Sequence, residues 1–367
     1  MVQTQAVSEA DLDGVWMRRC LELAKKALGQ TAPNPLVGCV IVKDGKVVGE
    51  GFHPKAGQPH AEVNALRAAG AKAQEATLYV NLEPCNHYGR TPPCTEAVIA
   101  AGVRRVVVGM VDPNPQVAGR GIARLRAAGL EVTVGVEAVA CEQLNEAFRF
   151  RMVQQRPFGI LKYAMTLDGK IAATGGHSAW VTSAAARSQV HIWRKGCDAV
   201  VVGGGTVRQD NPLLTSRQAV TPLRVVMSRS LALPKQAQLW DTQTAPTLVC
   251  TEPAANPDMQ AFLQDRGVEV QLFSPLTPRT VMAFLYQRDC LSVLWECGGT
   301  LAAAAIADGS IQKVLAFIAP KIIGGHDAHS PVGDLGLTRM TDALILERTH
   351  WQEIGGDLLI EGYLPNL

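Results

Sequence analysis

Three potential metal ligands, far apart in the sequence, constrain this chain most. These candidate ligands are His60, Cys85 and Cys94. Glu62 lies two residues after the histidine, and Pro84 directly precedes the first cysteine. Imidazole and thiolate groups are preferred zinc ligands, and a catalytic zinc site usually has three protein ligands and one open position for water. Bound zinc lowers the pKa of that water toward neutrality, and Glu62 is placed to accept and deliver a proton. The fold must therefore bring three separate segments to one point.

The H-x-E…P-C pattern resembles the signature of zinc deaminases that act on nucleobases. In that signature two residues separate the cysteines, whereas eight separate them here, from Asn86 to Pro93. The alternative is that Cys85 and Cys94 are buried free thiols and that His60 caps a helix. The joint occurrence of all these residues favours the zinc site.

Composition limits the other possibilities. With 367 residues, the chain is long enough for two domains at roughly 150 residues each. The net charge is +2 without a basic run, so neither a nucleic acid nor a membrane surface is expected as a partner. The polar N-terminus lacks the features of a secretory signal, and no apolar run is long enough to span a membrane. The nine scattered cysteines are typical of reduced thiols, which predicts a cytoplasmic protein.

The first half alternates between helical and strand patterns. The Asp44-Gly45 pair, between two apolar runs, predicts a hairpin. The pattern predicts an α/β sandwich with helices on both faces of the sheet. The expected helices cover 11–28, 60–70, 94–101 and 119–129, and the expected strands cover 37–42, 46–52, 77–84, 104–111 and 131–136. His60 and Cys94 then begin helices and Cys85 follows a strand, at the sheet edge where ligands gather.

The second half predicts another α/β unit. A helix over 141–157 leads to it, and we place the boundary so that the domains are 1–150 and 151–367. The expected strands cover 158–165, 198–203, 223–228, 246–250, 268–273, 291–296 and 313–320, and the expected helices cover 183–195 and 299–309. Residues 205–222 are expected to form a substrate-facing loop and 251–262 a surface connection. Glycines at 203–205 and 298–299 would let backbone N–H groups approach a phosphate, but no Rossmann fingerprint is present.

Seven segments carry a family resemblance along nearly the whole chain. They are PNPLVGCVIV (33–42), HAEVNAL (60–66), LEPCNHYGRTPPC (82–94), VDPNPQVAGRGI (111–122), KYAMTLDG (162–169), GGGTV (203–207) and ECGGTL (296–301). The chain resembles the bifunctional riboflavin-biosynthesis family, in which a pyrimidine deaminase is joined to a pyrimidine reductase. The resemblance implies a cytidine-deaminase-like three-layer sandwich followed by a dihydrofolate-reductase-like α/β domain. It also implies zinc and NADPH as cofactors.

The resemblance further implies roles for individual residues. His60, Cys85 and Cys94 would bind zinc, and Glu62 would transfer protons. The implied NADPH contacts are Ala164, Trp180, Thr206, Asp210, Ser228, Gly298, Gly299, Thr300, Leu301, Ala302, Ala303 and Ala304. The implied substrate contacts are Asn34, Lys162, Ser178, Arg194, Leu214, Arg217 and Glu296.

The implied substrate is a phosphorylated pyrimidine. The first half would deaminate 2,5-diamino-6-ribosylamino-4(3H)-pyrimidinone 5′-phosphate. The second half would use the hydride of NADPH to reduce the ribosyl group of 5-amino-6-(5-phosphoribosylamino)uracil to the ribityl form. Arg194 and Arg217 would bind the 5′-phosphate. The proton donor is left open between Lys162 and Asp210. Enzymes of this kind often form dimers or tetramers, so a homo-oligomer is expected.

Two other classes of protein agree less well with the sequence. A nucleic-acid deaminase would share the zinc chemistry, but only 5% of the residues are aromatic, and such an enzyme needs stacking residues and a basic surface. It would also leave the second half unexplained. A non-enzymatic module with structural zinc would need a fourth protein ligand, for which His87 is the candidate.

Overall fold

The computed structural model describes residues 9–88, 92–115 and 117–365. The chain forms two compact units, residues 1–155 and 156–367. The centre of the spacer between Cys85 and Cys94, and residue 116 of the 111–122 segment, lie outside the described residues. Within the described part of the chain, no helix is both long enough and apolar enough to cross a membrane.

The first unit is built on a five-stranded sheet with the order β2-β1-β3-β4-β5. Strands β1 to β3 pair in an antiparallel manner, and β3 to β5 are parallel. Its elements are α1 (Glu9–Lys25), β1 (Gly38–Lys43), β2 (Lys46–Phe52), α2 (Ala61–Ala69), η1 (Gly70–Ala73), β3 (Thr77–Leu82), α3 (Cys94–Ala100), β4 (Arg105–Met110), α4 (Arg120–Ala127), β5 (Glu131–Val134), α5 (Ala138–Leu144) and α6 (Glu146–Gln154).

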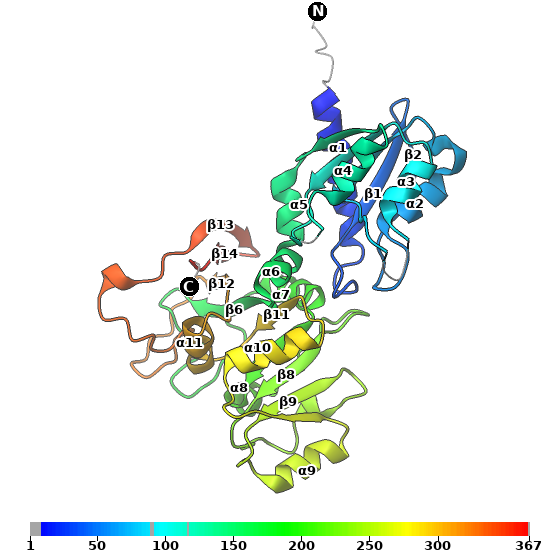
Figure 1. The fold of residues 1–367 in the computed structure, drawn as a ribbon. Coiled ribbons are helices and arrows are strands. Elements are labelled where there is room, and N and C mark those ends of the chain that lie inside the picture. Colours follow the sequence, from blue (N-terminus) through cyan, green and yellow to red (C-terminus); the bar gives the residue numbers. More distant parts are fainter. Residues whose placement is uncertain (1–8, 89–91, 116, 366–367) are drawn as a thin grey trace, which may run out of the picture. The chain divides into compact units, whose positions relative to one another are not determined.

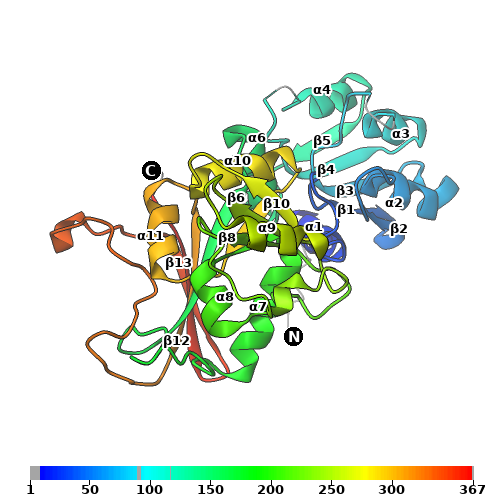
Figure 2. The ribbon, with the colours of Figure 1, turned by 90° about the horizontal axis from the view of Figure 1, so that it is seen from below.

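Helices cover both faces of this sheet. Helices α1 and α5 pack together on one face, and α2, α3 and α4 follow one another on the other (Figures 1 and 2). Glycines permit the close approach: a Cβ on Gly38 would lie 2.1 Å from the Cys20 carbonyl oxygen in α1, and one on Gly51 would lie 2.5 Å from the Ala65 nitrogen in α2. The predicted three-layer α/β sandwich is confirmed.

The second unit contains a nine-stranded mixed sheet with the order β10-β9-β8-β7-β11-β6-β12-β14-β13. Strands from β10 to β12 along this order are parallel, and β14 and β13 are antiparallel to their neighbours. Its elements are β6 (Phe158–Thr166), α7 (Ala184–Gly196), β7 (Ala199–Gly203), α8 (Gly204–Asp210), β8 (Leu223–Met227), η2 (Gln238–Trp240), β9 (Thr247–Thr251), α9 (Pro257–Asp265), β10 (Glu269–Leu272), α10 (Pro278–Gln287), β11 (Ser292–Trp295), α11 (Gly299–Ala307), β12 (Lys313–Ala319), η3 (Met340–Asp342), β13 (Glu347–Ile354) and β14 (Asp357–Tyr363).

The core of the second unit lies between this sheet and its helices. Buried strand residues such as Leu161, Val201 and Trp295 pack with Leu285 of α10 and Ile306 of α11. The central parallel strands are apolar on both faces because helices cover them on both sides. The seven strands predicted for this half are all present, so the prediction of a second α/β unit is confirmed.

Three expectations about local structure were wrong. The helix expected over 141–157 is two helices that meet at Asn145, whose φ of −107° and ψ of 23° lie outside the helical range. The surface connection expected over 251–262 contains the start of α9, where Asn256 caps the helix and Pro257 is its first residue. The first six residues of the loop expected over 205–222 belong to helix α8, which ends at Asp210, and β13 and β14 were not expected at all.

Candidate active sites

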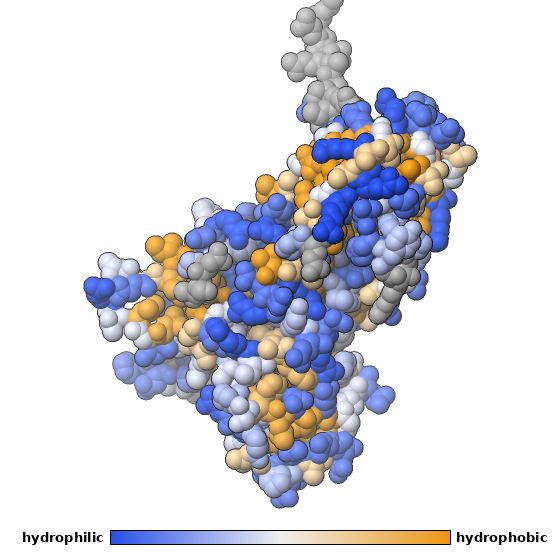
Figure 3. Space-filling model, in the orientation of Figure 1, coloured by the Kyte–Doolittle hydropathy of each residue, from blue (hydrophilic) through white to orange (hydrophobic). Residues whose placement is uncertain are grey.

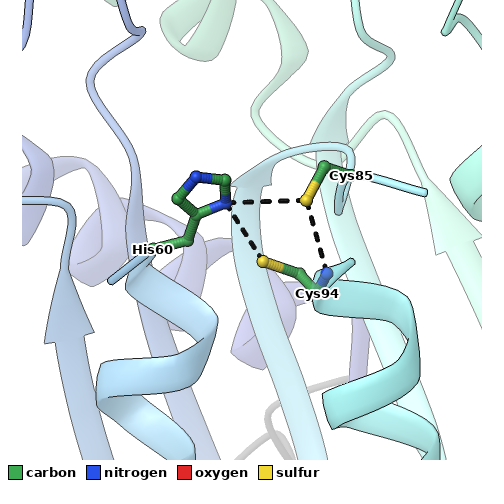
Figure 4. A group of neighbouring side chains, drawn as sticks. All are labelled: His60, Cys85 and Cys94. Carbon is green, nitrogen blue, oxygen red and sulfur yellow. Dashed lines mark hydrogen bonds between the residues drawn. The ribbon is translucent and has the colours of Figure 1, made fainter. Parts of the chain in front are cut away.

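The three expected metal ligands converge in the first unit. His60 precedes α2, Cys85 follows β3, and Cys94 is the first residue of α3, so helix and strand ends present all three side chains to one point (Figure 4). The Nδ1 atom of His60 lies 3.2 Å from the Cys94 sulfur and 3.5 Å from the Cys85 sulfur. Tetrahedral zinc, with bonds of about 2.0 Å to nitrogen and about 2.3 Å to sulfur, would separate such atoms by about 3.5 Å.

The three ligand atoms all lie within 4.8 Å of one another, and no fourth His, Cys, Asp or Glu joins them among the described residues. His87, the candidate fourth ligand, is exposed outside this group. The donor set of one nitrogen and two sulfurs fits zinc with an open position.

The electrostatics of the two cysteines also favour a cation. The hydrogen bond from Cys94 lowers the pKa of Cys85 to about 4. The same hydrogen bond is the largest cause, and burial the second, of a rise in the pKa of Cys94 above its usual range. A divalent cation stabilises both thiolates, because its charge offsets their mutual repulsion.

Glu62 lies beside these ligands, in the first turn of α2, and is 3% exposed. Burial is the largest cause, and the charge of Cys85 the second, of a rise in its pKa to about 7. Its Oε2 has no hydrogen-bond partner among the residues that the structure describes. A buried, unpartnered carboxyl oxygen with such a pKa is suited to exchange a proton with a ligand.

Asn34 is held close to the same site through His53. The Asn34 Nδ2 atom lies 3.0 Å from His53 Nε2, and His53 Nδ1 lies 3.2 Å from the Pro59 carbonyl oxygen. The His53 ring also packs edge-on against the His60 ring, with centroids 5.3 Å apart. In this arrangement His53 donates from Nδ1 and accepts at Nε2, so the Asn34 carbonyl oxygen remains available to a ligand.

In the second unit the expected residues gather at the carboxyl ends of adjacent parallel strands. Lys162 and Ala164 lie in β6, α8 follows β7, Ser228 follows β8, and Glu296 follows β11 just before α11. A Cβ on Gly204 would lie 3.2 Å from the Ser228 hydroxyl, and one on Gly203 would lie 3.4 Å from the Leu301 side chain. The starts of α8 and α11 and the end of β8 therefore adjoin one another. This is the edge at which parallel α/β sheets bind cofactors.

A charged triad occupies the centre of this edge. Arg194 donates to both carboxylate oxygens of Glu296, at 2.6 and 3.0 Å, and Lys162 Nζ lies 3.8 Å from Glu296. Although burial alone would raise the pKa of Glu296, Arg194 and Lys162 lower it to about 2. Burial lowers the pKa of Lys162.

Strained backbone marks other expected residues. Trp180, Leu214 and Arg217 have φ angles of 63°, 56° and 56°, in the left-handed region that side chains rarely adopt. Such strain is frequent at ligand sites. Trp180 is exposed and stacks on Arg187, whose guanidinium carbon lies 4.2 Å from the ring centroid. The Ser178 hydroxyl donates a hydrogen bond to Asp210 at 2.6 Å, which brings two of the expected residues together.

Sequence reasoning missed residues that hold the site from behind. Asn81 is fully buried: its Oδ1 accepts from the N–H of Gly38, and its Nδ2 donates to the Leu36 carbonyl. Asn145, at the α5–α6 junction, forms hydrogen bonds to the backbone of Leu36 as well. His53 is a third such residue, since it lies between Asn34 and His60. No local pattern marks these roles, because each depends on a partner distant in the sequence.

Comparison with known proteins agrees with both halves. Residues 11–110 match the cytidine and deoxycytidylate deaminase zinc-binding region, and residues 157–360 match the RibD C-terminal domain. The riboflavin biosynthesis protein RibD of Synechocystis sp. is 63% identical over 354 residues, covering 96% of both chains. The RibD of Aquifex aeolicus is 42% identical, covering 95% of this chain and 98% of its own.

Solved structures give the same result. Acinetobacter baumannii RibD superposes with a TM-score of 0.86 at 40% identity, covering 97% of this chain and all of its own. The Thermotoga maritima diaminohydroxyphosphoribosylaminopyrimidine deaminase/5-amino-6-(5-phosphoribosylamino)uracil reductase superposes with a TM-score of 0.85 at 36% identity, covering 98% of this chain and all of its own. The chain therefore belongs to the RibD family and is a bifunctional enzyme of riboflavin biosynthesis, which joins a zinc-dependent deaminase to an NADPH-dependent reductase.

Proposed function

We propose that the first unit removes the 2-amino group of 2,5-diamino-6-ribosylamino-4(3H)-pyrimidinone 5′-phosphate. His60, Cys85 and Cys94 hold zinc, which when bound lowers the pKa of a water molecule toward neutrality. The observation that carries this proposal is the convergence of these three ligand atoms beside Glu62, whose Oε2 has no partner among the described residues.

Glu62 moves the protons in this scheme. Its carboxylate accepts a proton from the attacking water and delivers it to the departing amine, so that ammonia leaves. A pKa of about 7 lets the group both accept and release a proton near neutral pH. The Asn34 amide nitrogen donates a hydrogen bond to His53, which fixes the orientation of the side chain. The Asn34 carbonyl oxygen is then free to accept a hydrogen bond from the pyrimidine.

The second unit reduces the ribosyl group of 5-amino-6-(5-phosphoribosylamino)uracil to the ribityl form. NADPH supplies the hydride when bound. The cofactor contacts are Thr206 and Asp210 at the two ends of α8, Ser228 after β8, and residues 298–304, together with Ala164 and Trp180. The substrate lies over Lys162 and Glu296 and contacts Ser178 and Leu214.

The geometry favours Lys162 over Asp210 as the proton donor. Asp210 is exposed and accepts a hydrogen bond from Ser178, whereas Lys162 is mostly buried and has a lowered pKa. A buried lysine with a lowered pKa releases its proton more readily. Arg194 is engaged with Glu296, which leaves Arg217, exposed, as the residue that binds the 5′-phosphate.

We also propose that the chain forms a homo-oligomer through its second unit. Strand β13 ends the nine-stranded sheet and is exposed along nearly its whole length. Hydrophobic surface lies on this side of the unit (Figure 3), and Met340, Ile345 and Trp351 are 89%, 78% and 67% exposed. An open edge with apolar neighbours favours association. Light scattering of the purified protein tests whether it is a homo-oligomer.

The nine cysteines are all free, which supports a reducing, cytoplasmic location.

The decisive experiment assays each half-reaction separately on the purified protein and on Glu62→Gln. Replacing the acid/base group is expected to lower the deaminase kcat by about 10²–10⁴-fold. Zinc content and the reductase rate should stay unchanged. If Glu62→Gln deaminates at the parental rate, the assigned proton transfer is wrong.

A further inference from the structure

A buried carboxylate lies directly before the turn that carries Cys85. Glu83 is 4% exposed, and each of its oxygens accepts two backbone N–H groups. Oε1 accepts from Gly121 at 2.8 Å and Ile122 at 3.1 Å, and Oε2 accepts from Gly119 at 2.9 Å and Asp112 at 3.1 Å. Gly121 and Ile122 lie in the first turn of α4, Gly119 is the residue before it, and Asp112 lies between β4 and α4.

This arrangement supplies a cap that α4 otherwise lacks. Gly119, the residue before α4, offers no side chain to the first turn. The free N–H groups of a helix N-terminus need acceptors, and a negative charge there also interacts favourably with the helix dipole. Glu83 meets both needs across a distance of 36 residues in the sequence. The glycine-rich start of α4 is therefore occupied by the chain's own carboxylate.

The same segment contacts both neighbours of Cys85. A Cβ on Gly121 would lie only 2.1 Å from the Pro84 carbonyl oxygen, so the two backbones are in direct contact. The Asn86 side chain donates to the Arg120 carbonyl at 3.4 Å and accepts from the Thr95 hydroxyl at 2.9 Å. Residues 83, 84 and 86 are thus all fixed by neighbouring segments. Cys85, between them, directs its sulfur toward His60.

We propose that Glu83 is a positioning residue of the deaminase site. Its carboxylate fixes the 83–86 turn against the start of α4, and this holds the Cys85 sulfur at ligand distance from His60 and Cys94. Glu83 touches neither the substrate nor the metal. This inference rests on the proposed zinc site and adds the residue that sets its geometry.

Two variants test the proposal by different routes. Glu83→Gln keeps the side-chain shape but turns an amide donor toward two backbone donors. Gly121→Ala keeps the carboxylate but pushes the Pro84 backbone through an added Cβ. Glu142→Gln is the control, because it removes a carboxylate from an exposed ion pair with Arg149 in the same unit. The reductase rate of each protein shows whether the rest of the chain is intact.

The measurements are zinc affinity, by competition with a chelator, and the absorption spectrum of the Co²⁺-substituted protein. Loss of support behind metal ligands typically weakens metal binding by about 10–100-fold. We expect Glu83→Gln and Gly121→Ala to lose about tenfold or more in zinc affinity and to change the cobalt–thiolate bands. The control should match the parent in both measurements. If Glu83→Gln does not fold, Gly121→Ala carries the test alone.

Two results would contradict the inference, each for a different reason. If both variants only lower the thermal stability, while zinc affinity and the cobalt spectrum match the parent, Glu83 is a helix cap and the inference is wrong. If the parent protein itself binds no zinc, the proposed metal site is wrong and the inference falls with it.

Discussion

The side chain of Asn145 pairs with both backbone polar groups of Leu36, 109 residues away. Its Oδ1 accepts the Leu36 N–H at 2.9 Å, and its Nδ2 donates to the Leu36 carbonyl at 3.0 Å. Asn81 donates to the same carbonyl at 3.0 Å. Asn34 lies two residues before Leu36, so two buried asparagines hold the segment that presents the proposed pyrimidine contact.

Asn145→Ala should therefore impair the deaminase through substrate binding. The substitution leaves partly buried backbone groups of Leu36 with fewer partners, which costs up to about 1–3 kcal/mol. We expect the deaminase KM to rise by about tenfold with a smaller change in kcat, and the reductase constants to stay the same. Steady-state kinetics of both half-reactions provide the measurement. An unchanged deaminase KM would show that Asn34 does not depend on this anchor.

The substitution Lys162→Arg separates two roles of this residue, donating a proton and supplying a positive charge. Arginine keeps a cation beside Glu296 but does not release a proton near neutral pH. We expect the reductase kcat to fall by about 10²-fold or more, with KM near the parental value. If Asp210 is the donor instead, Lys162→Arg should keep its rate and Asp210→Asn should lose it.

The pH profile of the reductase gives a second view of Lys162. Burial lowers its pKa, so the protonated donor is lost as pH rises through a value below the ordinary value of about 10.4. In the parent, kcat/KM should decline on the alkaline side with that midpoint. The decline should be absent from Lys162→Arg. A parental profile that is flat up to pH 10 would contradict the assignment.

The Arg194–Glu296 pair predicts a pH-dependent stability difference. Glu296 has a folded pKa of about 2, below its ordinary value of about 4.3, so its stabilising effect is fully present above about pH 4.3 and is lost as pH falls toward 2. Arg194→Met leaves this carboxylate without its main partner. Near pH 6 we expect the variant to be less stable by about 3 kcal/mol, and the difference should narrow as the pH falls.

Urea unfolding at several pH values measures this difference. Tryptophan fluorescence reports mainly on the second unit, because Trp16 is the only one of the six tryptophans in the first. A difference between parent and variant that stays constant from pH 6 to pH 3 would show that the pair does not set the Glu296 pKa.

The sequence indicated most strands because their apolar runs are continuous and their turns are marked. Asp44 and Gly45 both adopt positive φ angles, as their hairpin pattern predicts. Strand β13 was missed because it is exposed on both faces and therefore carries no apolar alternation. The start of α9 carries a readable signal, because Asn256-Pro257 is a typical cap and first residue of a helix.

The zinc ligands and Glu62 were predictable because the H-x-E and P-C patterns are specific and occur together in one order. The contacts that orient them were not. In the second unit, Arg194 pairs with Glu296, 102 residues away, and no periodicity in the sequence reports such a pair. Glu83 was visible within the LEPC segment, but its four N–H partners, which include Gly121 and Ile122 of α4, lie 29 to 39 residues further along the chain.

X-ray absorption at the zinc edge tests the central claim most directly. The account predicts one zinc ion per chain, bound by two sulfur atoms at about 2.3 Å and two lighter atoms at about 2.0 Å, with one sulfur lost in Cys94→Ser. Deaminase activity should disappear with the metal, while the reductase activity remains. A metal-free active deaminase, or a zinc ion bound by four protein ligands, would contradict the account.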